Sequence, residues 1–227
     1  MTIKIDPYIA SKAIYIDFEG NAGRIPTFLG VLYQDLTTCK KVLNRYVHED
    51  VFRTAGDHSD RCQNNSMEEA FDSLLKIAET EDRLFFAWST REKLAIQTFI
   101  SDEGLKNRVL SRLFDCKTIA KRWKYRFHSD VEFMSTWGGK HRLSEYMKLV
   151  GYSVPRSAGP GNTGVRLKYV RNQLINREQN YLDLTPTAKR KWKNVLSHNY
   201  HDCRGMREVI RKSIDGLGSS IYKNKVR

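Results

Sequence analysis

The stretch Ala13-Ile-Tyr-Ile-Asp-Phe-Glu-Gly20 decides the fold, because it has the composition of a buried strand that ends at a glycine. Its acids Asp17 and Glu19 are two residues apart, and such side chains project from one face of a strand. Burying two carboxylates together is costly unless they are paired or bind a metal ion. Because Mg²⁺ and Mn²⁺ prefer oxygen ligands, the strand predicts a metal site. An edge strand with two solvated acids is the alternative.

The segments around this strand predict an α/β fold. Runs at 13–19, 27–33 and 42–47 have short connections and indicate an antiparallel meander. Residues 48–66 are expected to form a long loop, and two shorter strands are expected at 83–88 and 113–115. The order βββ-α-β-α-β-α predicts a mixed sheet flanked by helices, in a single domain over residues 1–227. Helices are expected after a capping box at Ser66–Glu69, after Ser89 or Thr90, and over 116–127, 143–150, 165–177 and 186–214.

Charge is divided unevenly along the chain, which carries a formal net charge of +13. Residues 1–115 hold 15 Lys and Arg against 18 Asp and Glu, whereas residues 116–227 hold 24 against 8. The mildly acidic half suits a metal site, and the strongly basic, mostly helical half suits a polyanion-binding surface. We therefore expect nucleic acid as the partner. Anionic lipid is less well supported, because no basic amphipathic segment has a strong aromatic face.

The remaining composition predicts an intracellular, cytoplasmic protein. No apolar stretch approaches the roughly 18 residues of a membrane span, and the N-terminus lacks the apolar core of a signal peptide. The cysteines are far apart and have no Cys-x-x-Cys spacing. They therefore predict reduced thiols, and neither a disulfide framework nor a zinc site.

Two further segments carry residues suited to phosphoryl transfer. Glu92 lies in the first turn of an expected helix, where the helix dipole by itself also favours a carboxylate. His198 and Asp202 are four residues apart in the last helix, so they face the same way. Such a carboxylate can hold a metal ion while the imidazole takes a proton from water, although a solvated polar face has the same pattern. Asp115 is interpreted as the N-cap of the helix that follows it, in preference to an outer-shell acid.

Together these segments resemble the three motifs of the DEDD exonuclease superfamily, whose members have an RNase H-like fold. Asp17-x-Glu19 resembles motif I, and His198-x₃-Asp202 resembles motif III. Residues 88–94 resemble motif II, with Glu92 where most members have Asp, as in a branch of predicted bacterial RNase H-like nucleases. The resemblance covers the chain from the first predicted strand to about residue 214.

Motif III departs from the family pattern. The superfamily usually has Tyr four residues before the aspartate or His five residues before it. Here His198 stands at the tyrosine position and Ser197 at the histidine position. Tyr200 and His201 are therefore alternatives to His198 as general base.

The resemblance implies a divalent-metal-dependent nuclease for DNA or RNA, most simply a 3′-5′ exonuclease that uses two Mg²⁺ or Mn²⁺ ions. Asp17 would bridge the two ions, and Glu19 and Asp202 would bind the ion that activates water. Glu92 would act directly or through a water molecule. Without metal, four such acids would raise one another's pKa values. A non-catalytic nucleic-acid-binding protein is the competing interpretation, and a nuclease subunit of a larger assembly is compatible with the first.

Basic clusters in the second half are expected to contact the phosphates of single-stranded ends. Trp123, Phe127 and Trp192, which lie among them, are expected to be core residues. Weaker signals are a phosphate clamp that begins at Trp137 and a flexible substrate loop at 159–164. The candidate phosphate-binding residues are Lys117, Lys121, Arg122, Lys124, Arg126, Lys140, Arg142, Lys189, Arg190, Lys191 and Lys193.

Overall fold

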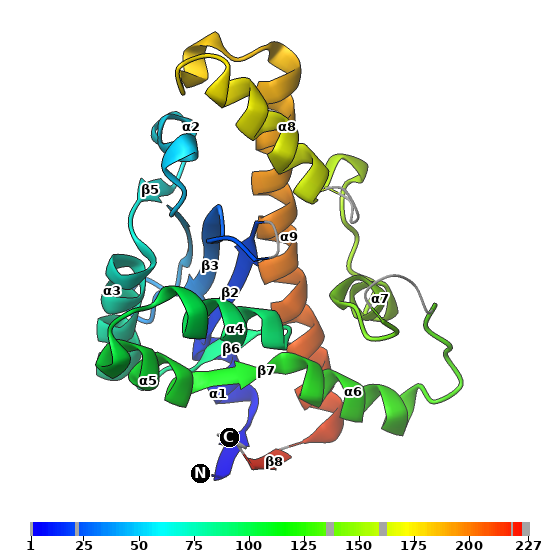
Figure 1. The fold of residues 1–227 in the computed structure, drawn as a ribbon. Coiled ribbons are helices and arrows are strands. Elements are labelled where there is room, and N and C mark those ends of the chain that lie inside the picture. Colours follow the sequence, from blue (N-terminus) through cyan, green and yellow to red (C-terminus); the bar gives the residue numbers. More distant parts are fainter. Residues whose placement is uncertain (1, 21–22, 135–138, 159–162, 219, 224–227) are drawn as a thin grey trace.

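The computed structural model describes residues 2–20, 23–134, 139–158, 163–218 and 220–223 (Figure 1). The strands of its main sheet are β2 (Ile14–Glu19), β3 (Phe28–Gln34), β4 (Lys41–Val47), β5 (Cys62–Asn64), β6 (Phe85–Ala87) and β7 (Leu113–Asp115). Their order is β5-β4-β3-β2-β6-β7. Strands β2, β3 and β4 form an antiparallel meander, β6 and β7 continue it in parallel from β2, and β5 runs parallel to β4. The expected α/β fold with a mixed sheet is confirmed.

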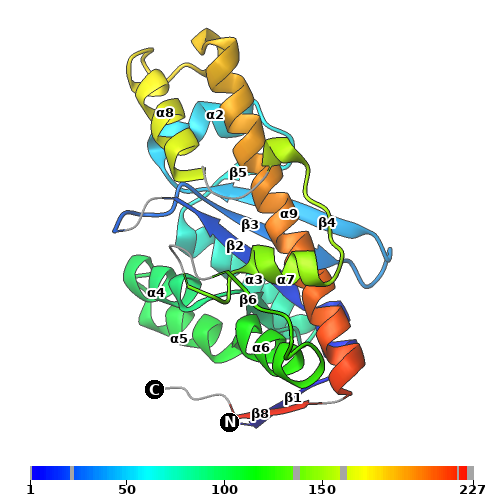
Figure 2. The same cartoon turned by 90° about the vertical axis from the view of Figure 1, so that its right-hand side faces the viewer.

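Helices cover both faces of this sheet. They are α1 (Pro7–Lys12), α2 (Arg53–Asp57), α3 (Met67–Thr80), α4 (Thr90–Phe99), α5 (Glu103–Arg112), α6 (Cys116–Phe127), α7 (Leu143–Leu149), α8 (Thr163–Ile175) and α9 (Pro186–Leu217). The 32-residue helix α9 crosses one face over β2 and β3, with α6 and α7 packed beside it (Figure 2). Helix α3 covers the opposite face together with α5. Among the helices described, none combines the length and the apolar composition needed to cross a bilayer.

Alternation along β2 places the two layers of the core. Ile14 and Ile16 are fully buried against the α3 side of the sheet. Tyr15 is buried in the other cluster, with the apolar residues of α6, α7 and α9. Because residues i and i+2 share a face, Asp17 and Glu19 project with Tyr15 toward α9.

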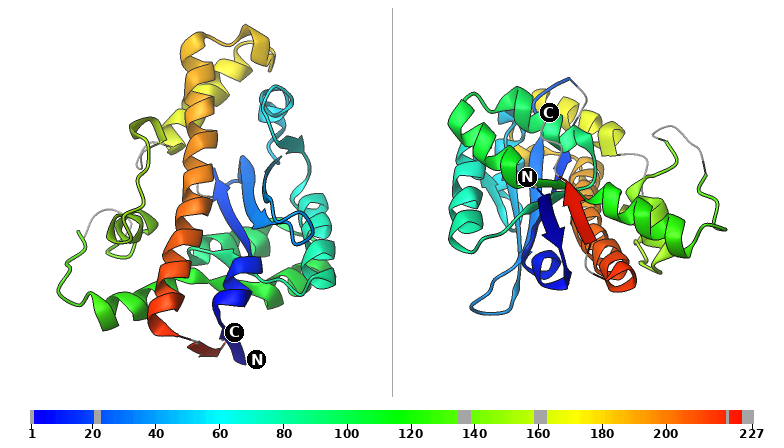
Figure 3. Two further views of the ribbon diagram at one scale, coloured as in Figure 1. Left: turned by 180° about the vertical axis from the view of Figure 1, so that it is seen from behind. Right: turned by 90° about the horizontal axis from the view of Figure 1, so that it is seen from below.

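Several short elements differ from the sequence-based expectation. The segment 48–66 is not a long loop, because it contains a 3₁₀ turn at Asp50–Phe52, helix α2 and strand β5. Helix α5 was not expected, nor was the antiparallel pair of β1 (Thr2–Ile5) and β8 (Ser220–Lys223), which joins the two ends of the chain (Figure 3). Elements this short and this polar lack the apolar periodicity that sequence-based prediction requires, so pairing partners decide them.

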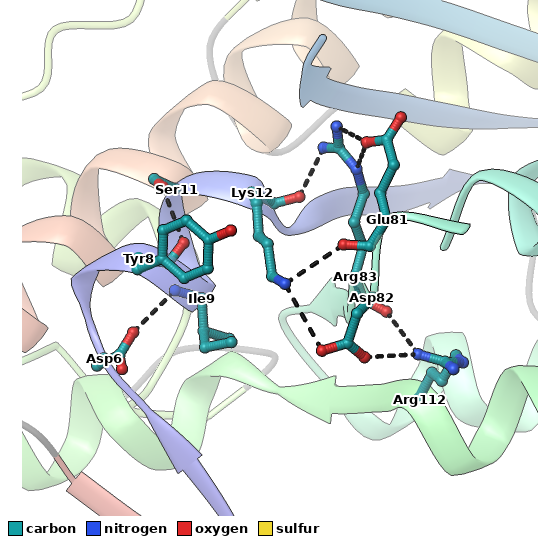
Figure 4. Close-up of polar contacts among 9 residues, drawn as sticks. All are labelled: Asp6, Tyr8, Ile9, Ser11, Lys12, Glu81, Asp82, Arg83 and Arg112. Atoms are coloured by element: carbon teal, nitrogen blue, oxygen red, sulfur yellow. Dashed lines mark hydrogen bonds and ion pairs between the residues drawn. The ribbon is translucent and has the colours of Figure 1, made fainter. Parts of the chain in front are cut away.

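A buried arginine fixes the base of the sheet (Figure 4). The Arg83 side chain is fully buried and forms an ion pair with Glu81. Its guanidinium also donates to the carbonyl oxygens of Lys12 at 2.6 Å and Gln34 at 2.8 Å. These contacts connect the segment before β6 to the segment before β2 and to the last residue of β3. Arg83 therefore helps to set the parallel pairing of β2 with β6.

Candidate active site

Asp17 and Glu19 come from the centre of the sheet, because β2 pairs with β3 on one side and with β6 on the other. Asp17 is half-buried and Glu19 is 7% exposed. Both side chains line a cleft of about 670 Å³ on the α9 side of the sheet. The alternative of an edge strand with solvated acids is therefore wrong.

Glu92 reaches the same cleft from the first turn of α4. It forms a capping box with Ser89, whose backbone N–H and hydroxyl donate to Glu92 Oε2 at 3.0 and 2.8 Å. Glu92 is therefore both a capping residue at the start of α4 and a residue of the cleft. The cap orients the carboxylate, because it fixes one of the two oxygens.

His198 and Asp202 enter the cleft from α9. The imidazole Nε2 lies 3.4 Å from Asp202 Oδ2 and 4.0 Å from Glu19 Oε1. On the other side of the ring, Nδ1 is 2.8 Å from the carbonyl oxygen of Ala158. A carbonyl oxygen can only accept, so Nδ1 is the donor and Nε2 of the neutral ring is an acceptor that faces the acids.

The other two candidates for the base are held elsewhere. His201 Nδ1 is hydrogen-bonded to the Tyr152 hydroxyl at 2.9 Å. The Tyr200 hydroxyl accepts a hydrogen bond from Arg204 at 3.0 Å. Neither of the two lines the acidic cleft. His198 is thus the histidine that the structure places with the carboxylates.

The four carboxylates perturb one another strongly. Burial raises the pKa of Asp17 well above its ordinary value, and nearby Asp202 and Glu92 raise it further. Burial likewise raises the pKa of Glu19, with Asp17 as the next cause. The pKa of Asp202 rises to about 7 through burial and the charge of Glu92, and burial also raises the pKa of Glu92. Burial and mutual repulsion therefore favour the protonated forms of these acids, and a bound cation would oppose that shift.

This donor set has the chemistry of a divalent-cation site, since all four acids supply oxygen ligands. Glu19 Oε1 is buried and has no hydrogen-bond partner. A buried carboxylate oxygen without a partner is costly, and ligation of a cation would satisfy it. As the side chains stand, however, no three His, Cys, Asp or Glu residues in the described ranges form a ready-made metal-binding group. The electrostatics fit a cation, and the side chains would have to converge to ligate one.

Asn199 is a site residue that sequence reasoning missed. Its Nδ2 donates to the carbonyl oxygen of Asp17 at 3.0 Å and to Asp17 Oδ2 at 2.9 Å. Gly30, which pairs with Asp17 across β2 and β3, makes room for it: a Cβ on Gly30 would lie 1.7 Å from Asn199 Oδ1. A glycine inside a buried strand often marks a close approach, and this was the available signal.

The rest of the cleft is largely apolar. Phe18, Leu94 and Phe99 form part of its wall, and Arg24 and Arg91 are cations on its border. Phe18, Arg91 and Leu94 lie within the segments that resemble motifs I and II, but the sequence alone assigned none of these five residues to the cleft. Their combination offers an apolar surface beside the acids and positive charge near it.

The predicted basic clusters lie at opposite ends of α9 (Figure 1). The α6 cluster is near the cleft: lysines 117, 121, 124 and 140 lower the pKa of His141, after burial. The His141 carbonyl accepts a hydrogen bond from Trp88, which lines the cleft. Arg122, Arg126 and Lys140 are exposed, Lys117, Lys121 and Arg142 are half-buried, and the second cluster (Lys189, Arg190, Lys191, Lys193) lies at the start of α9.

Lys124 is buried, so it does not have the exposure that the expected phosphate contact requires. It is only 7% exposed, and its Nζ lies over the rings of Tyr125 and Phe133. Position 124 falls on the inner side of the amphipathic helix α6, so packing covers the long aliphatic stem.

Three other expectations concern aromatic residues and a helix cap. Trp123 and Trp192 are core residues as expected, whereas Phe127 is 45% exposed and is not. Asp115 is the N-cap of α6, since Oδ1 accepts from the Lys117 N–H at 2.9 Å. Trp137 and residues 159–162 lie outside the described ranges.

Comparisons of the chain with protein-family models, with curated proteins and with solved structures gave no match. Functional inference therefore depends on the chemistry of the site.

Proposed function

We propose that this protein is a divalent-metal-dependent nuclease that hydrolyses phosphodiester bonds of DNA or RNA, most simply as a 3′-5′ exonuclease. The observation that carries the proposal is the convergence of four carboxylates from β2, α4 and α9 on one cleft. Their pKa values are raised, and a buried Glu19 oxygen has no partner. Such a cluster is costly unless cations neutralise it.

Each residue has a defined role in this proposal. Asp17, Glu19, Glu92 and Asp202 would hold two Mg²⁺ or Mn²⁺ ions, which would supply charge stabilisation for the attacking and leaving oxygens. His198 accepts a proton from water at Nε2, because its Nδ1 donates to Ala158. Asn199 positions Asp17 through its two hydrogen bonds.

The proposed partner is nucleic acid with a single-stranded end. The half-buried Lys117 and Lys121 of α6 and the exposed Lys140 lie on the side of the cleft marked by Trp88 and His141, where they can contact phosphates. The apolar wall with Phe18 and Phe99 suits an unpaired base. We further propose a cytoplasmic location, which the four free cysteines support.

The decisive experiment incubates the purified protein with end-labelled single strands of DNA and RNA in Mg²⁺ or Mn²⁺, with EDTA as the control. We expect metal-dependent shortening from the 3′ end. Internal cuts would support the assignment as a nuclease and would show that it acts as an endonuclease.

A second candidate is a non-catalytic nucleic-acid-binding protein on the same scaffold. The observation in its favour is that the acids in the described ranges do not form a ready-made metal group. Binding of strands without cleavage in either metal would favour this second candidate.

A further inference from the structure

Helix α9 divides its face of the sheet into two sides. Asp17 pairs with Gly30, and Gly30 pairs with Arg45, so the three residues form one row across β2, β3 and β4. Directly paired residues project from the same face. Asn199 of α9 sits over Gly30, between the other two residues. The acids therefore lie on one side of the helix, and Arg45 lies on the other.

A second pocket, of about 720 Å³, opens on the Arg45 side. Lys193, Ser197 and Tyr200 of α9 line it, at helix positions that repeat on one face. At about 100° per residue, this face is opposite to that of His198 and Asp202. The second pocket is therefore separate from the acidic cleft, although both are built on α9.

Positive charge dominates the second pocket. Arg45 is its floor, with only 7% of its surface exposed, and Arg61 and Lys193 are exposed cations that also line it. Among the residues that line the pocket, Asp60 is the carboxylate, and it offers Arg45 its backbone oxygen, at 3.4 Å from Nη1. The side chains thus leave an excess of positive charge around the cavity.

Arg45 differs from the other buried arginines in the described ranges. Arg83 is paired with Glu81, and Arg171 with Glu49. Arg45 instead donates to two neutral carbonyls, including that of Leu196 at 3.0 Å, and its buried Nε has no hydrogen-bond partner.

The environment of Arg45 supplies no counter-charge. Burial lowers its pKa, and the nearby groups that oppose this effect are the thiols of Cys62 and Cys203, of which Cys203 also has its pKa raised by burial. Burial in turn raises the pKa of Cys62, so the thiol is neutral at neutral pH. A buried guanidinium without an anion is costly, and the pocket beside it has room for one.

We propose that the second pocket binds a phosphate group, with Arg45 as its buried guanidinium and Lys193 and Arg61 as the cations at its rim. Arginine suits this role because its planar N–H groups match phosphate oxygens. The proposal of a phosphate site is argued from the residues of the second pocket and does not depend on the proposed nuclease function. Only the assignment of the phosphate to a nucleic-acid strand depends on the proposed nuclease function.

The test measures thermal unfolding of the full chain in metal-free buffer while inorganic phosphate replaces chloride at constant ionic strength. A ligand that binds the folded state raises the melting temperature. We expect phosphate to stabilise the native protein, and Lys193→Ala to weaken its apparent affinity about tenfold. Lys212→Ala is the matched control, since it removes an exposed charge from the same helix outside the pocket.

Arg45→Met is the second variant, and we expect it to lose the response to phosphate. If it does not fold, Lys193→Ala and Arg61→Ala carry the test. Equal stabilisation of the native protein and these variants would overturn the proposal, and so would no stabilisation by phosphate. Asp17→Asn should keep the full response, so that failure of the nuclease proposal and failure of this one are distinguishable.

The source of the phosphate is tested with 5′-phosphorylated and 5′-hydroxyl strands of one sequence in EDTA. If Lys193→Ala weakens only the phosphorylated strand, the pocket binds a terminal phosphate. Equal weakening of both strands identifies an internal phosphodiester. If neither strand is weakened while inorganic phosphate is, the ligand is free phosphate.

Discussion

At the scale of single residues, Asp17 is the carboxylate whose charge matters most to the proposed chemistry. Asp17→Asn keeps the shape of the side chain, and its amide oxygen can still accept from Asn199. We expect cleavage in saturating Mn²⁺ to fall by more than the 10²–10⁴-fold that loss of a general base costs. Affinity for single strands in EDTA should be nearly unchanged, because the basic half supplies it.

Circular dichroism and strand-binding assays on Asp17→Asn separate loss of chemistry from loss of fold. Substantial cleavage by a folded Asp17→Asn protein would show that the metal site lies elsewhere.

His198 is the residue that we propose as the general base. Its Nε2 faces Asp202 and Glu19, whereas His201 is hydrogen-bonded to Tyr152. We expect His198→Ala to lower single-turnover cleavage about 10²–10⁴-fold in saturating metal. His201→Ala is the matched control and should retain most of the rate. A larger loss in His201→Ala, or an unaltered rate in His198→Ala, would assign the base elsewhere.

At the scale of elements, the docking of α9 on β3 depends on a missing side chain. Gly30→Ala would place a Cβ 1.7 Å from Asn199 Oδ1, so the helix or the asparagine must shift. We expect a loss of about 1–3 kcal/mol in the free energy of unfolding, as for other overpacked cores. Cleavage should fall as well, because Asn199 holds Asp17.

Chemical denaturation of Gly30→Ala, Asn199→Ala and the double variant measures this coupling. The double variant should be more stable than the sum of the single losses, because the shorter side chain removes the clash. Strict additivity would show that Gly30 and Asn199 do not oppose each other in the folded protein.

At the scale of the whole molecule, the acidic cluster should make stability depend on pH and on metal. The pKa of Asp202 is about 7 in the fold, against about 4 for an unfolded aspartate. Its stabilising contribution is therefore complete below about pH 4 and is lost as the pH rises through about 7. We expect the melting temperature of the metal-free protein to fall from pH 5 to pH 8, and Mn²⁺ to raise it more at pH 8.

Asp202→Asn is the control for this effect, because it removes the group that titrates. It should reduce both the pH dependence and the gain from Mn²⁺. The same gain at pH 5 and pH 8 in the native protein would mean that Mn²⁺ does not replace protons in the cleft.

The strands of the meander, the longer helices and the pairs of acidic residues on one face follow from local sequence patterns. The apolar run that begins β2, the capping boxes at Ser66 and Ser89 and the four-residue spacing of His198 and Asp202 are all local patterns. Residue periodicity fixes which side chains share a face, so these features could be predicted without a tertiary structure.

How these helix and strand faces pack against one another depends on contacts between distant segments of the chain. The clearance above Gly30, the position of Asn199 on Asp17, the burial of Lys124 and the exposure of Phe127 depend on where α9 and α6 pack. The same holds for Arg45, which the sequence shows only as one basic residue in a strand. The lack of a counter-charge beside Arg45 follows from its position between β4 and α9. Burial and the distance to a charged partner arise from contacts between residues far apart in the chain.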